Sequence, residues 1–166
     1  MLFRSDADGY GALFAAMGVG SLIGSLSLAF LGARRPVLRM ILGGAVGFVT
    51  FETALGLSRA PWAVLPSIVL VGLASMLMVN SINVMVQNSV PDALRGRVMA
   101  LYVTVFAGST PIGSVFAGGI AQLWGAPTAM ILGAGIGSLV LIVVAWQLLV
   151  LGKAWTDAPA RPASIS

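Results

Sequence analysis

No charged side chain occurs between Val98 and Gly152, a stretch of 55 residues that reads VMALYVTVFAGSTPIGSVFAGGIAQLWGAPTAMILGAGIGSLVLIVVAWQLLVLG. A helix needs about 20 apolar residues to cross the hydrocarbon of a bilayer, so this stretch is long enough for two spans. Gly125, Ala126 and Pro127 mark the turn between them, because a proline just after a glycine suits the start of a helix. The stretch does not alternate apolar and polar residues as a membrane β-barrel does, so helical spans are expected.

The gaps between the remaining charges predict three more spans. Runs with no charge, or with one, extend from Gly9 to Ala33, from Met40 to Ser58 and from Ala60 to Pro91. Together with the long stretch they predict spans at about residues 10–32, 38–58, 62–87, 98–122 and 127–151. The chain is therefore expected to be an all-α membrane protein, with five transmembrane helices over residues 10–152. An outer segment, residues 1–9, precedes this domain, and a disordered cytoplasmic tail, residues 153–166, follows it.

The composition excludes an ordinary water-soluble enzyme. Only 8% of the 166 residues are charged and 58% are hydrophobic, whereas a soluble domain carries about 25% charged residues. The chain has no cysteine and no histidine, which removes thiol nucleophiles, histidine bases and most zinc, haem and iron–sulfur sites. We therefore expect no enzymatic activity, no metal, no cofactor and, despite the net charge of +4, no nucleic-acid partner.

The basic residues predict how the chain is oriented in the membrane. Seven of the nine fall in three segments that five spans place on one side, namely Arg34, Arg35, Arg39, Arg95, Arg97, Lys153 and Arg161. The other side has only Arg4 and Arg59. Because lysine and arginine collect in cytoplasmic loops, the N-terminus should face out and the C-terminus should face the cytoplasm. The expected location is the inner, or plasma, membrane of the cell.

Small residues recur every four positions within the spans, as they do where transmembrane helices pack closely. The pattern comprises Ala12, Ala16, Gly20 and Gly24 in the first span, Gly43 and Gly47 in the second, Ser109, Gly113, Ala117 and Ala121 in the fourth, and Gly133 and Gly137 in the fifth. These ridges are either static contacts between helices, which is the commoner case, or surfaces that slide. Pro111 should kink the fourth span, either as fixed geometry or as a hinge.

Three amide side chains lie near the inner end of the third span. Asn80, Asn83 and Gln87 are spaced so that they share one face of a helix. Buried amides need hydrogen-bond partners, so these residues either bond to a neighbouring helix or line an aqueous pathway. A pore formed by several copies of the chain is a weaker alternative that would use the same face.

Glu52 is the only carboxylate inside a predicted span. An ionisable residue within the membrane suggests a functional site, here a group that carries a proton. The residue also lies near the outer end of its span, seven positions before Arg59. Solvation at the membrane surface, or an ion pair with Arg59, is therefore the simpler interpretation.

The segment between the third and fourth spans is the most structured polar stretch, and from Val90 it reads VPDALRGRV. Pro91 disfavours a helical conformation at Val90, so the third helix should end there. Asp92 is expected to cap the next helix and to meet its positive end. With Arg95 and Arg97, Asp92 forms either a loop that sets the topology or a charged lock between helix ends.

The stretch NSINVMVQNSVPDALRGRVMALY, residues 80–102, resembles the major facilitator superfamily of transporters. The similarity is closest to the efflux branch of enterobactin-exporter-like and macrolide-exporter-like permeases. The opening GYGALFAAMGVG, residues 9–20, also fits, and the similarity continues through Phe106, Gly108, Pro111, Gly113, Ala117 and Gly118.

The resemblance implies a twelve-helix fold in two halves, in which the five spans match helices eight to twelve. Such proteins bind a small molecule between the halves and transport it by alternating access, generally driven by a proton or sodium gradient. The three amides would lie near the inner gate. The residues that match the loops of the cytoplasmic gate are Asp92, Arg95, Arg97, Arg34 and Arg35.

On this resemblance the chain is expected to be the C-terminal fragment of a proton-coupled efflux transporter, inactive without helix seven and the N-terminal half. Its partners would be the lipid bilayer, the missing half or another membrane chain, and, in the full-length form, a small-molecule substrate. The alternative is a non-transporting membrane fragment, or an interaction partner of another membrane protein.

Overall fold

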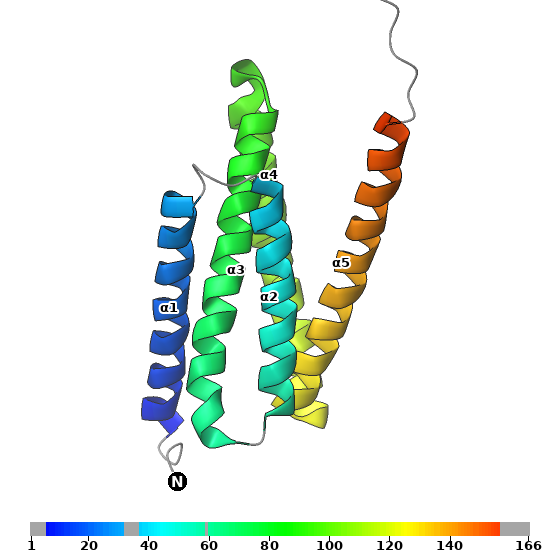
Figure 1. Cartoon of the computed structure of the whole chain (residues 1–166). Helices are drawn as coiled ribbons and strands as arrows, with labels where there is room; N and C mark the ends of the chain where they lie inside the picture. Colours follow the sequence, from blue (N-terminus) through cyan, green and yellow to red (C-terminus); the bar gives the residue numbers. More distant parts are fainter. Residues whose placement is uncertain (1–5, 32–36, 59, 157–166) are drawn as a thin grey trace, which may run out of the picture.

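The computed structural model describes residues 6–31, 37–58 and 60–156. Within these ranges the chain forms five α-helices and no strand, and each helix is long and apolar enough to cross a membrane (Figure 1). The expectation of an all-α membrane protein with five spanning helices is therefore confirmed. The helices are α1 (Asp6–Leu31), α2 (Val37–Leu57), α3 (Pro61–Ser89), α4 (Asp92–Trp124) and α5 (Ala126–Thr156).

Several helices extend beyond the apolar runs that predicted them. α1 begins at Asp6 and α4 at Asp92. In α4 the carboxylate of Asp92 lies in the first turn, where it favours the positive end of the helix. α5 continues through Thr156, past the position at which the tail was expected to begin, and residues 157–166 lie outside the described ranges. Val90, which follows α3, is extended, with φ −114° and ψ 133°, as the proline after it requires.

Consecutive helices run antiparallel, and their packing order differs from their order in the chain. α1 packs against α3, α3 against α2, α2 against α5 and α5 against α4; Figure 1 shows α1, α3, α2 and α5 in a row. The starts of α2 and α4 and the end of α5 therefore lie at one end of the bundle. We call this the basic end, because the first two turns of α2 and α4 carry Arg39, Arg95 and Arg97.

Glycines set the spacing between α1 and α3. A Cβ added to Gly20 would overlap the carbonyl group of Val69, and one added to Gly24 would overlap the carbonyl group of Leu73. Both glycines are buried. The two backbones are thus in direct contact, as the ridge of small residues in the first span predicted.

The contact ridge of α2 is shifted by one residue from the prediction. Gly44, and not Gly43, is buried against α3, where an added Cβ would lie 2.9 Å from the Cβ of Met78. A Cβ at Gly47 would lie 3.3 Å from the Cβ of Ala74, whereas no neighbouring helix lies within 4 Å of one at Gly43. The prediction for Gly43 is wrong because glycine occupies both positions, and spacing alone does not say which of them faces the neighbour.

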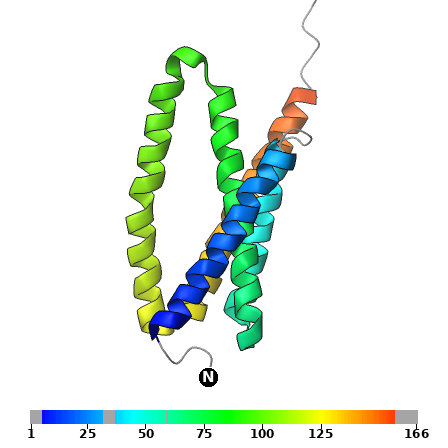
Figure 2. The same ribbon diagram turned by 90° about the vertical axis from the view of Figure 1, so that its left-hand side faces the viewer.

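α4 stands apart from the other helices along much of its length (Figure 2). None of its residues is buried. It packs chiefly against α5, and it has fewer contacts with α3. No neighbouring helix lies within 4 Å of a Cβ built at Gly113, so the packing role of this ridge stays a prediction. The helix runs unbroken through Pro111, and the kink there also stays a prediction.

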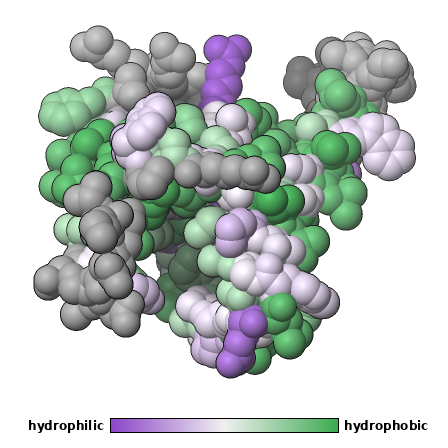
Figure 3. Space-filling model, turned by 90° about the horizontal axis from the view of Figure 1, so that it is seen from below, coloured by the Kyte–Doolittle hydropathy of each residue, from purple (hydrophilic) through white to green (hydrophobic). Residues whose placement is uncertain are grey.

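The end opposite the basic end carries the α2–α3 and α4–α5 connections. Seen from this end, the described surface is mostly apolar, and hydrophilic side chains are isolated from one another (Figure 3). The α4–α5 connection is a single residue, Gly125, whose φ of 89° lies in the region that favours glycine. This turn fixes the start of α5 beside the end of α4.

Candidate functional site

An ion pair marks the start of α4 at the basic end. Nη2 of Arg95 contacts Oδ1 of Asp92, one turn earlier, and both side chains are exposed. Nε of Arg95 also donates a hydrogen bond to the main-chain carbonyl of Gln87 in α3, at 3.3 Å. Arg95 therefore ties the start of α4 to the last turns of α3.

Asp92 does not cap α4, contrary to expectation. The cap position is held by Pro91, with φ −55° and ψ 146°, and no side chain forms a capping hydrogen bond. Asp92 instead lies within the first turn, where its carboxylate meets the positive end of the helix and pairs with Arg95. Arg97 is exposed. Arg34 and Arg35 lie outside the described residues, so a cluster that combines both basic loops stays a prediction.

Asn80 uses its amide to join two helices. Its Nδ2 donates a hydrogen bond to Oγ of Ser25 in α1, at 3.0 Å, in partly buried surroundings. This is the contact that the packing interpretation of the three amides predicts. Asn83 is half-buried and Gln87 is exposed, and their part in a pathway stays a prediction.

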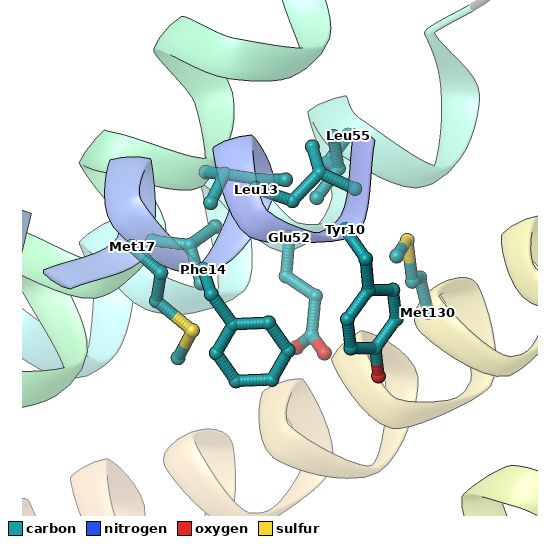
Figure 4. Close-up of a pocket in the computed structure, with 9 residues that line it drawn as sticks. Tyr10, Leu13, Phe14, Met17, Glu52, Leu55 and Met130 are labelled. Atoms are coloured by element: carbon teal, nitrogen blue, oxygen red, sulfur yellow. The ribbon is translucent and has the colours of Figure 1, made fainter. Parts of the chain in front are cut away.

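Glu52 borders a cavity of about 260 Å³ among α1, α2, α3 and α5. Tyr10 and Phe14 of α1 point into the same space (Figure 4). The remaining lining is apolar and consists of Leu13, Met17, Leu55, Ile68, Val71 and Met130. Of the described residues that line this cavity, Glu52 alone is charged.

The same side chain borders a second cavity, of about 320 Å³, among α2, α4 and α5. On α4 this cavity is lined by the small residues Ala117, Gly118 and Ala121. Glu52 and Met130 line both cavities, and a Cβ built at Gly133 of α5 would lie 3.4 Å from Oε1 of Glu52. The carboxylate thus stands where the two spaces meet.

The half-buried carboxylate of Glu52 has no ion-pair or hydrogen-bond partner among the described side chains. Arg59, the partner that the sequence suggested, lies outside the described residues. Burial of an ionised carboxylate in apolar surroundings costs free energy unless a cation pairs with it or the group takes up a proton. No group of three metal-ligating side chains occurs in the described ranges. A single carboxylate such as that of Glu52 can bind a proton or a cation, and its role in doing so stays a prediction.

The sequence analysis did not single out the aromatic wall of the first cavity. Tyr10 and Phe14 lie one turn apart on α1, with ring centroids 5.0 Å apart, and they are 64% and 62% exposed. Their spacing of four residues was the available signal, since such pairs share one helix face. The spacing alone does not show that the two rings line a cavity with Glu52. That becomes visible only in the structure, where α1 and Glu52 of α2 border the same cavity.

A comparison with known protein families gives a match that covers all five helices. The family model described as transmembrane secretion effector matches residues 1–162 of the chain. The searches of curated proteins and of solved structures found no match to the chain.

Proposed function

Because the chain belongs to the transmembrane secretion effector family of the major facilitator superfamily, we propose that it is the part of a secondary active exporter that corresponds to helices eight to twelve. The five membrane-crossing helices are what such a part requires. The exported substrate is a small molecule, which moves out of the cytoplasm across the plasma membrane. The driving force is an ion gradient, since secondary transporters bind a coupling ion together with the substrate during alternating access.

One observation carries the proposal. The carboxylate of Glu52 lies within the membrane-spanning part of the chain, at the junction of two cavities. An ionisable group within a helix that is long and apolar enough to cross a membrane is expected to take part in function. By taking up a proton from one side of the membrane and releasing it to the other, Glu52 would couple export to the proton gradient.

The contacts of Arg95 support a gate at the basic end. Arg95, itself on α4, pairs with Asp92 one turn earlier in the same helix and donates a hydrogen bond to the carbonyl of Gln87 on α3. The hydrogen bond to Gln87 joins the two helix ends, and the ion pair with Asp92 positions the side chain that donates it. Alternating access requires one end of the bundle to close as the other opens. We assign the basic end to the cytoplasm, because arginine collects on that side of a membrane.

The exposure of α4 supports a requirement for further helices. None of its residues is buried, and no neighbouring helix contacts a Cβ built at Gly108, Gly113, Gly118 or Gly119. Faces rich in small residues commonly pack against another transmembrane helix. We propose that helix seven and an N-terminal half complete the exporter, and that the five helices alone do not transport.

Export from cells tests the proposal. The chain is produced alone and, in parallel, with the hydrophobic spans that the DNA upstream of the Met1 codon encodes. Loss of macrolides and siderophores from loaded cells is then measured with and without a protonophore. We expect the longer product to export in a way that the protonophore abolishes, and the chain alone to export nothing. Upstream DNA without such spans, or a longer product that does not export, contradicts the proposal.

Asp92→Ala in the longer product tests the gate separately. We expect export to fall at an equal amount of protein in the membrane, because Arg95 loses the carboxylate that positions its side chain for the hydrogen bond to Gln87 on α3. Full export by this variant would show that the pair does not act as a gate.

A non-transporting interaction partner is the second candidate, and the same exposure of α4 favours it. The chain has no cysteine, so a single Val115→Cys substitution places one cross-linking group on α4, at a residue that is 77% exposed and lines neither cavity. Cross-links to spans of the same longer product support the exporter. Cross-links to an unrelated membrane protein, without export, support the second candidate.

A further inference from the structure

The carboxylate of Glu52 and two aromatic rings face one space. Tyr10 and Phe14 approach the cavity from α1, and Glu52 approaches it from α2 (Figure 4). The two ring planes are inclined by 45°, and more than half of each aromatic side chain is exposed. The rings are therefore available to a molecule that occupies the cavity.

This combination of groups favours a positively charged ligand. A carboxylate attracts a cation, and it does so more strongly where apolar walls exclude water. The face of an aromatic ring attracts a cation as well, and quaternary ammonium groups are typical ligands of aromatic walls. An anion of the same shape would be repelled by the carboxylate and would gain nothing from the ring faces.

The lining favours an organic cation over a metal ion. Apart from Glu52 and the phenol of Tyr10, the described lining consists of hydrocarbon and thioether groups. Hard metal cations need about six oxygen ligands, which these residues do not supply. An organic cation needs no such shell, and its apolar part is stabilised when it leaves water.

The cavities define the size of the ligand. The first measures about 260 Å³ and the second about 320 Å³, and they meet at Glu52 and Met130. Pockets for drug-sized molecules measure about 300–1,000 Å³. A molecule with one aromatic ring therefore matches the first cavity, and a bulkier one would extend into the second toward α4.

We propose that Glu52, Phe14 and Tyr10 form a binding site for lipophilic organic cations. The charged group lies at the carboxylate, and the apolar body lies against the rings. This inference deepens the proposed function, because it names the substrate class that the exporter would take at this site. Equilibrium binding tests the site without transport. An absence of cation binding would therefore refute the site and leave proton-coupled export untouched, and an absence of export would leave the binding result untouched.

Two probes of similar shape and opposite charge give the first measurement. Benzyltrimethylammonium and phenylmethanesulfonate are dialysed to equilibrium against the full chain in lipid nanodiscs, with empty nanodiscs as background. We expect saturable binding of the cation, with one site per chain and an affinity about tenfold or more above that of the anion. Equal affinity for the two probes, or no binding above the background, overturns the proposal.

Substitutions locate the site. Glu52→Gln removes the charge at nearly constant size and should weaken cation binding by about tenfold, because a charge-assisted contact is lost. Glu52→Asp keeps the charge and should retain most of the affinity. Unchanged binding in Glu52→Gln, as expected if Arg59 already neutralised the carboxylate, would refute the site.

A matched pair on α1 tests the aromatic wall. Phe14→Leu should weaken cation binding by about threefold, because the ring face is lost while the volume changes little. Phe30→Leu makes the same change at a residue of α1 that is 76% exposed and does not line either cavity, and it should leave binding unchanged. Thermal unfolding of both variants confirms that they are folded. Equal losses in the two variants overturn the role of Phe14.

Discussion

Gly133 of α5 faces the carboxylate of Glu52, and a Cβ built there would lie 3.4 Å from Oε1. This distance is an ordinary van der Waals contact, so a methyl group fits at position 133. A larger side chain would extend into the space that the carboxylate occupies. The glycine therefore keeps the surroundings of Glu52 open on the α5 side.

Gly133→Leu should weaken binding of benzyltrimethylammonium by about tenfold, which corresponds to about 1.4 kcal/mol. The leucine side chain would fill the place where the cation meets Glu52, whereas Gly133→Ala should retain binding. Gly135→Leu is the control, because no neighbouring helix lies within 4 Å of a Cβ at that position. Dialysis of the three variants in nanodiscs measures the effect, and equal losses at positions 133 and 135 would contradict it.

Gly24→Ala should lower the free energy of unfolding by about 1–3 kcal/mol, the range for overpacking of a close contact. The added methyl group would meet the main chain at Leu73 of α3, and a backbone contact is not relieved by rotation of a side chain. Gly18→Ala in the same helix has open space around its Cβ and should leave stability unchanged or raise it by up to about 1 kcal/mol, because alanine is the better helix former. Reversible unfolding in mixed micelles compares the two. Similar values would mean that the glycine ridge does not set the α1–α3 contact.

Asn80→Ala and Ser25→Ala should show a coupling energy of about 0.6 kcal/mol in a double-mutant cycle, the average for such bonds between transmembrane helices. The coupling arises from the 3.0 Å hydrogen bond between Nδ2 of Asn80 and Oγ of Ser25. A coupling of zero, together with altered export in Asn80→Ala, would favour a role in the pathway over a role in packing.

Cation binding should weaken as the pH is lowered, because a proton and an organic cation compete for the one carboxylate of Glu52. The affinity is highest where Glu52 is ionised and is lost as the pH falls through its titration. The phenol of Tyr10 is the other titratable group that lines the first cavity in the described part of the chain, and α3, α4 and α5 contribute no titratable side chain to either cavity. Dialysis from about pH 4 to about pH 9 should show this dependence in the parent chain and not in Glu52→Gln. A parallel dependence in both would assign it to another group.

Single cysteines should report the orientation of the chain, which has no cysteine of its own. Ala93 lies in the first turn of α4 at the basic end, and Ala126 begins α5 at the opposite end; both are exposed. A membrane-impermeant maleimide should label Ala126→Cys in intact cells, and Ala93→Cys only after permeabilisation, if the basic end is cytoplasmic. The reverse pattern would place the basic end outside.

The number and type of helices could be predicted from the spacing of charges, since hydrocarbon excludes charge over about 20 residues. The family, too, could be recognised from the sequence around Asp92, and the family match over residues 1–162 agrees with it. The partners of each helix face could not be predicted. Spacing identified Gly20 and Gly24 correctly because no neighbouring glycine offered an alternative register, whereas Gly43 and Gly44 offered two.

The candidate site could be predicted only in part. Glu52 was identified because a carboxylate within a span is rare. Its aromatic neighbours were not, because Phe14 precedes it by 38 positions in the sequence and the two meet only through the packing of α1, α2 and α3. Likewise, the capping role expected of Asp92 failed because Pro91 took the cap position, and the ion pair with Arg95 followed from that shift by one residue.

The length of α4 links the site to the surrounding lipid. Its charge-free part, residues 98–124, makes a helix of about 40 Å at 1.5 Å per residue, whereas the hydrocarbon of a bilayer is about 30 Å thick. A helix longer than the hydrocarbon accommodates the mismatch by tilting, and packing against neighbours normally limits that tilt. Because the described part of the chain buries no residue of α4, bilayer thickness contributes to its inclination about the Gly125 turn wherever no further helix packs against it. The width of the second cavity, which Glu52 of α2 and Ala117 of α4 both line, thereby becomes sensitive to the composition of the membrane.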